Sequence, residues 1–251
     1  MDLHGRDSKS VGDIIMWQRT GIVVVLVAAA IWPESQVKAA GEAETRPLKL
    51  KVGTYSVKDV SIAGALQELK ARVLEKNLIV TLEVAPFERK PEENITVAVS
   101  DCTVKEVLDR ITRLDPRYSY SVFRGGLIHV FPVPGRDDPN DLLNTKVKAF
   151  TTSGVPYDRL LQYPNYYIPE LGAELLRRSK AGGVAVSELS STGVPGVTVE
   201  VRNATVRDIL NQISLNAAKV AKSPVVPTGW VYTFRVDKSV PLGGHPRWSL
   251  F

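Results

Sequence analysis

The chain has 251 residues, of which 44% are apolar and 24% are charged; its formal net charge is +5 and its sequence pI about 9.2. This length allows one large or two small domains with a hydrophobic core, and the composition argues against a wholly disordered chain. Because the basic excess is small and forms no Lys/Arg block, it is typical of a solubilising surface and not of a nucleic-acid-binding face. The single cysteine, Cys102, excludes an intrachain disulfide and leaves a cysteine-based metal site short of ligands.

An uninterrupted apolar run of 11 residues occupies positions 21–31, and Arg19 lies before it. A helix that spans a bilayer needs about 20 apolar residues, so the run fits the hydrophobic centre of a secretory signal better than a permanent anchor. Small residues at the end of this segment predict cleavage after Ala39. We therefore expect residues 1–39 to be a signal peptide or, if uncleaved, an inner-membrane anchor built on residues 21–32. In both cases the folded part lies in the periplasm.

The first 15 residues are polar and of mixed charge, and a secretory signal does not need them. The five residues that begin at Met16 would make a compact basic start by themselves. We therefore expect translation to start at Met16.

The first half of the remaining chain alternates between strand and helix patterns. Period-two alternation indicates strands, and apolar residues at steps of three and four indicate helices. Thr103 and Glu106 have the spacing of a capping box, which predicts a helix start. Two glycines, Gly125 and Gly126, predict a tight hairpin turn. In chain order we expect a strand over 48–52, a helix over 61–77, strands over 78–84 and 95–99, a turn over 100–102, a helix from 103, and a hairpin over 118–123 and 127–131.

A second copy of part of this pattern appears 102 residues later. Residues 95–114 align without gaps on residues 197–216, with seven of 20 positions identical. Internal duplication explains this match better than coincidence, because the order of features on both sides also agrees. Cys102 corresponds to Ala204, so the position calls for a small side chain and favours packing over a reactive thiol.

The second half is less regular. It begins with a possible strand over 142–150, followed by a helical pattern over 157–178 that is interrupted at Pro164 and Pro169. After the repeated strand and helix, residues 229–236 are expected to form the closing strand. The Pro and Gly content predicts a linker over residues 132–141, an exposed loop over 181–194 and a fraying, flexible tail over 237–251.

With this order of elements in view, residues 48–132 resemble the secretin and TonB short N-terminal domain, a small periplasmic α+β module of two β-α-β units. The resemblance is carried by the helix starts at residues 61–66 and 103–108, the strands at 78–84 and 95–99, and the hairpin through residues 125–126. Residues 143–236 resemble the family only loosely, as a second related domain. In the family, the module lies at the entrance of secretins or TonB-dependent receptors and contacts other proteins.

The resemblance implies an α+β fold of two tandem small domains, with helices packed on short sheets, preceded by the N-terminal hydrophobic helix. The sequence departs from the family because it lacks the long series of alternating ten-residue strands that would form an outer-membrane barrel. A freestanding pair of such modules implies a binding or assembly role on an envelope protein.

A catalytic constellation is not apparent. His129 lies in a predicted strand and is interpreted as a surface or half-buried imidazole, and His245 lies in the predicted tail. Three carboxylates, Glu88, Glu92 and Glu93, share a loop with basic residues, which indicates a solvated loop. The sequence contains no P-loop, dinucleotide fingerprint or nucleophile elbow. We expect no catalytic, cofactor-binding or metal-binding residues.

Aromatic residues concentrate on the predicted hairpin strands, and three tyrosines lie among prolines in the second half. Core packing against the helices explains the strand aromatics; an exposed edge strand that accepts a partner's strand is the alternative. The candidate partner-binding residues are Tyr118, Tyr120, Phe123, Tyr163, Tyr166, Tyr167, Trp230 and Tyr232.

The sequence therefore favours a non-catalytic periplasmic binding or assembly module that docks on a secretion or outer-membrane transport component. The alternative is an envelope hydrolase that acts on peptidoglycan or another glycan through paired carboxylates. Contact with single-stranded DNA is a weaker third hypothesis, and nucleic acid is not the expected partner.

Overall fold

The computed structural model describes residues 45–84, 94–134, 136–178, 193–221, 228–235 and 245–251. The predicted signal segment, the carboxylate-rich loop and most of the predicted loop over 181–194 lie outside these ranges. No helix within the described ranges is long and apolar enough to cross a membrane.

The first half begins with a 3₁₀ turn and ends with a hairpin. Its elements are β1 (Lys51–Val60), α2 (Ile62–Arg72), β2 (Val80–Val84), β3 (Ile95–Thr103), α3 (Val104–Leu114), β4 (Tyr118–Phe123) and β5 (Leu127–Pro132). Ser61 starts α2 because its hydroxyl accepts a hydrogen bond from the Gly64 amide at 3.1 Å. The hairpin turn places Gly125 and Gly126 at positive φ, as the sequence predicts.

The second half has the same kinds of element with extra short helices. These elements are β6 (Lys146–Pro156), α4 (Tyr157–Gln162), α5 (Pro164–Tyr167), α6 (Pro169–Arg178), β7 (Gly196–Thr205), α7 (Val206–Val220), β8 (Trp230–Arg235) and β9 (His245–Leu250). The predicted breaks at Pro164 and Pro169 are confirmed, since α5 and α6 each begin at one of these prolines.

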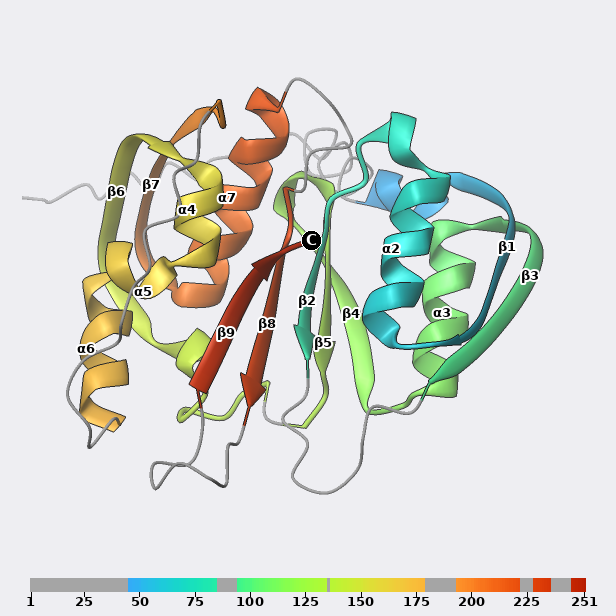
Figure 1. Ribbon diagram of the computed structural model, residues 1–251, viewed down its shortest axis with the longest axis horizontal. Helices are drawn as coiled ribbons and strands as arrows, with labels where there is room; N and C mark the ends of the chain where they lie inside the picture. Colours follow the sequence, from blue (N-terminus) through green and yellow to red (C-terminus); the bar gives the residue numbers. More distant parts are fainter. Residues whose placement is uncertain (1–44, 85–93, 135, 179–192, 222–227, 236–244) are drawn as a thin grey trace, which may run out of the picture.

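The molecule is built in layers, with one central sheet between two flanking units (Figure 1). The sheet has the strand order β4-β5-β2-β8-β9, and β2 runs parallel to both of its neighbours. On one side, α2 and α3 lie between this sheet and the antiparallel ribbon β1-β3 (Figure 1). On the other side, α4 and α7 lie between the sheet and the ribbon β6-β7. The α+β class is therefore confirmed.

Each side of the central sheet has its own hydrophobic core. Val80 and Leu82 of β2 belong to the first core with residues of α2, α3 and β1. Trp230 and Tyr232 of β8 belong to the second core with residues of α7 and β6. The first core is built mainly from residues before 131 and the second from residues after 141, with Phe251 as an exception in the first; strands of both parts hydrogen-bond within one sheet. The tandem units are therefore joined by backbone pairing between β2 and β8.

The repeated segments adopt the same local backbone. Asp101 and its counterpart Asn203 both have positive φ, at 48° and 51°. Both helices begin with complete capping boxes, formed by Thr103 with Glu106 and by Thr205 with Asp208. The strand-to-helix turn of the first copy is therefore rebuilt in the second.

Three local predictions are wrong. Residues 46–49 form a 3₁₀ turn that starts next to Pro47, so the first strand begins at Lys51 and not at Leu48. Residues 100–102 do not form a turn but continue β3, and the change of direction is made within the strand by the positive φ of Asp101. The predicted tail contains β9, which pairs with β8 and which tolerates a proline because it is an edge strand.

The last residue anchors the predicted tail. Phe251 is buried in the first core, and its backbone exchanges two hydrogen bonds with Gly229 at 3.0 and 3.1 Å. These contacts explain why residues 245–251 pack instead of fraying.

Candidate functional site

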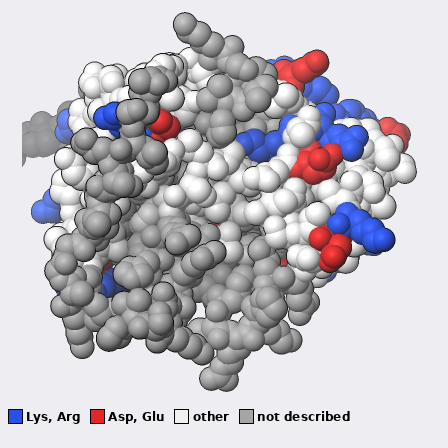
Figure 2. All heavy atoms as spheres, viewed as in Figure 1, with Lys and Arg blue, Asp and Glu red and all other residues white. Residues whose placement is uncertain are grey.

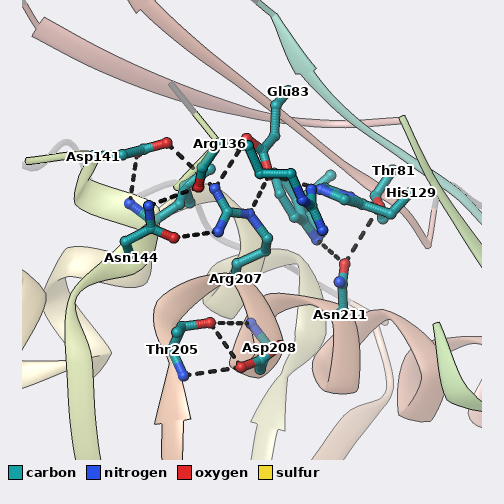
Figure 3. Close-up of polar contacts among 12 residues, drawn as sticks. Thr81, Glu83, His129, Arg136, Asp141, Asn144, Thr205, Arg207, Asp208 and Asn211 are labelled. Atoms are coloured by element: carbon teal, nitrogen blue, oxygen red, sulfur yellow. Dashed lines mark hydrogen bonds and ion pairs between the residues drawn. The ribbon is translucent and has the colours of Figure 1, made fainter. Parts of the chain in front are cut away.

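A cluster of buried polar side chains lies between the central sheet and α7 (Figure 3). We call it the buried polar cluster; its members come from β2, β5, α7 and the 3₁₀ turn before β6, and they are Thr81, Glu83, His129, Asp141, Asn144, Arg207 and Asn211. It joins the two halves of the chain, because β2 and β5 belong to the first half and α7 to the second.

Strand alternation places the first three members on one face. Thr81 and Glu83 alternate with Val80, Leu82 and Val84 in β2, so their side chains point away from the first core. On β5, His129 lies beside Thr81 because the two strands pair in parallel register.

The helix supplies the opposing face of the cluster. Arg207 and Asn211 are four residues apart on α7, so they project from the same side of the helix. The Asn211 Oδ1 atom lies 3.3 Å from Thr81 Oγ1 and 3.2 Å from Trp230 Nε1. The cluster is therefore closed by contacts from both halves.

Within the cluster, a hydroxyl, an imidazole and a carboxylate form a chain of hydrogen bonds. The Thr81 Oγ1 atom lies 2.7 Å from His129 Nδ1, and His129 Nε2 lies 2.6 Å from Glu83 Oε1. The same three types of group activate a nucleophile in many hydrolases. Here the three residues are only 0%, 1% and 2% exposed. A substrate therefore has no access to the Thr81 hydroxyl in this conformation.

Arg207 compensates the buried negative charge. Its guanidinium donates two hydrogen bonds to Glu83, and it also contacts Asp141 Oδ2 at 3.3 Å and the side-chain oxygen of Asn144. Burial alone would raise the pKa of Glu83, but His129 and Arg207 outweigh burial and lower this pKa to about 2. Glu83 is thus ionised, and a charge-assisted bridge crosses between the two halves.

His129 is held in its neutral form. Burial lowers the pKa of its imidazole more than the neighbouring Glu83 carboxylate raises it. Two aromatic rings flank it, those of Phe131 and Trp230, with ring centroids 5.6 and 5.3 Å away. The interpretation of His129 as a surface or half-buried residue is wrong, because β5 is covered on both faces.

The outer end of the cluster opens into a cavity of about 210 Å³. It lies where the parallel strands β2 and β5 end, a common position for ligand sites in α/β sheets. Its wall is formed by Glu83, Val84, Pro132, Pro134, Asp138, Asn140, Asp141, Leu142, Arg178 and Tyr232. A second hollow of about 540 Å³ adjoins it at Arg178.

The described residues contain no group of three or more His, Cys, Asp or Glu side chains that could hold a metal ion. His245 has a described backbone in β9, whereas its side chain lies outside the described part of the molecule.

The structure separates the eight predicted partner-binding residues. Tyr118, Trp230 and Tyr232 are buried in the two cores, so for these three the prediction of surface contact is wrong and core packing is confirmed. Their strands lie in the central sheet, and its faces are covered by helices.

The remaining five lie nearer the surface but do not form one patch. Tyr120 donates a hydrogen bond to Asp109 at 2.6 Å, and Phe123 is half-buried on the same edge strand. On the other side of the sheet, Tyr166 is 70% exposed and its ring meets that of Tyr167 edge-on at 5.3 Å. Tyr163, which lies next to α5, is half-buried.

Sequence reasoning missed most of the buried polar cluster, although part of its signal is visible. Thr81 and Glu83 are polar residues at alternating positions of an otherwise apolar strand, which indicates a polar face inside the protein. Arg207 could not be recognised from the repeat, because the residue aligned with it, Lys105, is exposed and gives no indication of a buried charge.

The fold and the cluster define an α+β protein in which two related strand–helix units share one sheet across a buried ionic bridge. Comparison of the chain with models of known families, with curated proteins and with solved structures finds no match.

The buried polar cluster predicts acid sensitivity. The pKa of Glu83 falls from 4.5 to about 2 on folding, so its stabilisation is present above about pH 4.5 and is lost as the pH falls toward 2. The pKa of His129 is below 6.5 in the folded state, so the unfolded chain takes up this proton first as the pH falls through 6.5. Urea titrations are therefore expected to show a falling free energy of unfolding from about pH 6.5 downward.

The variant His129→Gln separates the two contributions. It is expected to flatten the upper part of this pH dependence, near pH 6, and to retain the lower part that arises from Glu83. If the free energy of unfolding had the same slope against pH in the variant and the parent between about pH 7 and pH 5, His129 would not be the source of the upper part of the pH dependence.

Proposed function

We propose that this chain is a non-catalytic binding or assembly module of the bacterial cell envelope, located in the periplasm, that docks on a protein partner such as a secretion or outer-membrane transport component. The observation that carries the proposal is the pair of antiparallel ribbons, β1-β3 and β6-β7, on opposite outer sides of the molecule (Figure 1). Each ribbon offers strand edges to which a partner can add a strand.

The ribbons suit strand addition for three reasons. Among the described residues, β1 and β3 pair only with each other, and so do β6 and β7, which leaves their outer edges without a neighbouring strand; single carbonyls, such as that of Thr198, accept a hydrogen bond from a side chain. The strands are nine to eleven residues long, so they can form many main-chain hydrogen bonds. Alternate side chains, such as those of Ser56 and Thr198, are exposed and could give selectivity.

Surface charge favours a protein partner over nucleic acid. Figure 2 shows one face of the molecule, on which the charged side chains gather mainly over α2 and α3, with positive and negative groups side by side. Several form pairs, among them Glu68 with Arg72 and Lys105 with Asp109, at 2.7 and 2.6 Å. A nucleic-acid surface needs an excess of positive charge, whereas this mixture is typical of an ordinary protein surface.

The non-catalytic part of the proposal is supported by the closed state of the buried polar cluster. The Thr81 hydroxyl, which is hydrogen-bonded to His129 as an activated nucleophile would be, belongs to a fully buried residue. The cluster instead supplies a charge bridge that connects the halves, which is a structural task. The resemblance of residues 48–132 to the secretin and TonB short N-terminal domain supports a protein-contacting role.

Site-specific crosslinking tests the proposal. The native thiol of Cys102 is buried, its Sγ lies 3.1 Å from the Gly53 carbonyl oxygen, and burial raises the pKa of the thiol. A surface cysteine is therefore the only readily modified thiol. Full-length chains carrying Ser56→Cys or Thr198→Cys are expected, in intact native cells, to crosslink to a secretin-type or TonB-dependent envelope protein.

The matched control is Arg110→Cys, which places a thiol at an exposed position of α3 that belongs to neither ribbon. It is expected to give no such adduct. The proposal is wrong if neither ribbon position captures an envelope protein, or if Arg110→Cys captures the same protein with equal yield.

A second candidate, a hydrolase that acts on an envelope glycan, is favoured by one observation. Glu83 and Asp141 line the same cavity, and their pKa values move in opposite directions: the first is lowered, and burial raises the second. Both carboxylates are already bound to Arg207, which weakens them as acid and base. Release of reducing ends from purified peptidoglycan by the parent chain, with its loss in Asp141→Asn, would establish this candidate over the first.

A further inference from the structure

The cavity at the end of the buried polar cluster has the features of a small-ligand site. It runs from exposed residues at its rim, Pro134, Asp138 and Asn140, to buried residues at its base, including Glu83 and Leu142, as the burial pattern shows. Its wall combines apolar groups with a few converging polar side chains, which is the usual composition of such sites. Its volume of about 210 Å³ suits a ligand of the size of one six-membered ring with substituents.

One polar group on this wall has no hydrogen-bond partner among the described residues. Tyr232 is only 6% exposed, and no hydrogen bond joins its hydroxyl to another described residue; its oxygen is not one of the fully enclosed polar atoms that lack a partner, so it borders the open space of the cavity. A buried phenol usually finds a hydrogen-bond partner. Its pKa is raised first by burial and then by the carboxylates of Asp141 and Glu83, so the hydroxyl lies toward the polar end of the cavity. This unused donor and acceptor points to a ligand.

The charges around the cavity largely cancel. The three carboxylates of the wall are Glu83, Asp138 and Asp141, and the cation of the wall, Arg178, is itself paired with Glu174 at 2.7 Å. Arg207 lies behind the wall and is bound to Glu83 and Asp141. Arg136 also lies close enough to Glu83 for their charges to interact. A strongly cationic or anionic ligand would therefore meet little net attraction.

Hydrogen-bonding groups are what the wall offers instead. The side chains of Asp138 and Asn140 supply carbonyl and carboxylate oxygens at the rim, and Tyr232 supplies a hydroxyl at the base. Many of these groups are acceptors, so they require a ligand with several donors. Pro132 and Pro134 add apolar surface against which a ring can pack.

We propose that this cavity binds a neutral, polyhydroxylated ring, such as one hexose-type unit of a glycan, with Tyr232 as a binding residue. The ligand's hydroxyls donate to the rim oxygens and exchange a hydrogen bond with the phenol. This site is distinct from the ribbon edges and does not depend on the proposed docking role, because binding of a sugar unit requires neither a protein partner nor hydrolysis.

Ligand titration of the purified full-length chain tests this inference. The probes are glucose and N-acetylglucosamine, with methylammonium and acetate as charged comparisons, followed by saturation-transfer NMR. Saturable binding of at least one sugar is expected, with weaker or no binding of the two ions. The variant Tyr232→Phe is expected to raise the dissociation constant of that sugar about five- to tenfold, because one hydrogen bond to the ligand is lost.

Two further variants make the test specific. Tyr166→Phe removes the hydroxyl of an exposed tyrosine on α5, which is not part of the cavity wall, and is expected to leave binding unchanged. Asn140→Ala changes the rim at an exposed position and is expected to weaken binding without affecting the fold. The inference is overturned if neither sugar binds saturably, if Tyr232→Phe binds as the parent does, or if methylammonium or acetate binds more tightly than the sugars.

Discussion

Replacing Glu83 with glutamine is expected to lower the free energy of unfolding by about 3–5 kcal/mol, the usual cost of breaking a buried ion pair from one side. The substitution keeps the size of the side chain but removes its charge. Arg207 then remains almost fully buried, and the ion pair left to it among the described residues is the longer one with Asp141. The hydrogen bond that His129 Nε2 donates to the side chain at position 83 is also weakened. Equilibrium unfolding in urea, at about pH 7, measures the change.

The matched control is Glu68→Gln on α2. Glu68 forms an ion pair with Arg72 at 2.7 Å, but both side chains are substantially exposed, so solvent screens the pair. A change of less than about 0.5 kcal/mol is expected there. If Glu83→Gln cost no more than Glu68→Gln, the buried polar cluster would not be the bridge between the halves that we describe.

Replacing Gly229 with alanine is expected to lower the free energy of unfolding by about 3 kcal/mol, at the upper end of what overpacking costs. A Cβ atom at this position would lie 2.1 Å from the Val80 carbonyl oxygen and 3.2 Å from that of Phe251. Both obstacles are backbone atoms of neighbouring chain segments. The first can move only if the start of β8 separates from β2, which is the junction of the two halves, and the second only if it separates from the end of β9.

Gly53→Ala is the matched control for this prediction. Gly53 has a φ of +78°, but nothing lies within 4 Å of its added Cβ. The substitution therefore costs only the strain of a left-handed residue, about 1 kcal/mol. Thermal and urea unfolding of both variants gives the comparison, and equal effects would show that the close contact between Gly229 and Val80 does not exist.

Local structure could be predicted from the sequence wherever a short pattern determines it. The helix start at Ser61, the capping box of Thr103 and the turn at Gly125 are each set by residues within a few positions, and each is confirmed. The sharing of one sheet could not be predicted in this way. It depends on the pairing of Leu82 with Val231, which are 149 positions apart and have no complementary pattern of their own.

The strand aromatics illustrate the same limit at the level of the site. Alternation shows that Trp230 and Tyr232 share a face of their strand, but it does not show what covers that face. In the structure the covering element is α7 of the same half, so these side chains become core. The cavity beside Tyr232 also escaped prediction, because its wall is assembled from β2, β8, α6 and the segment between β5 and β6.

Cys102 shows where comparison of the two repeats succeeded. Its alignment with Ala204 predicted a packed small side chain, and the thiol is indeed buried near the end of β3, just before α3 begins. The repeat misled only where the copies have diverged: Lys105 and Arg207 align, yet the first is exposed and the second carries the charge bridge. The two repeated segments share a local backbone but differ in their inward-facing polar residues.

The central claim is that the two halves form one cooperative structure around the buried polar cluster and the junction of β2 with β8. Native-state hydrogen exchange of the full chain in increasing urea tests it most directly, because it reports both halves in one experiment. We predict that the amides of β2 and of α7 open with the same free energy and the same dependence on urea. Opening of α7 at a clearly lower free energy, while β2 stays protected, would contradict the account.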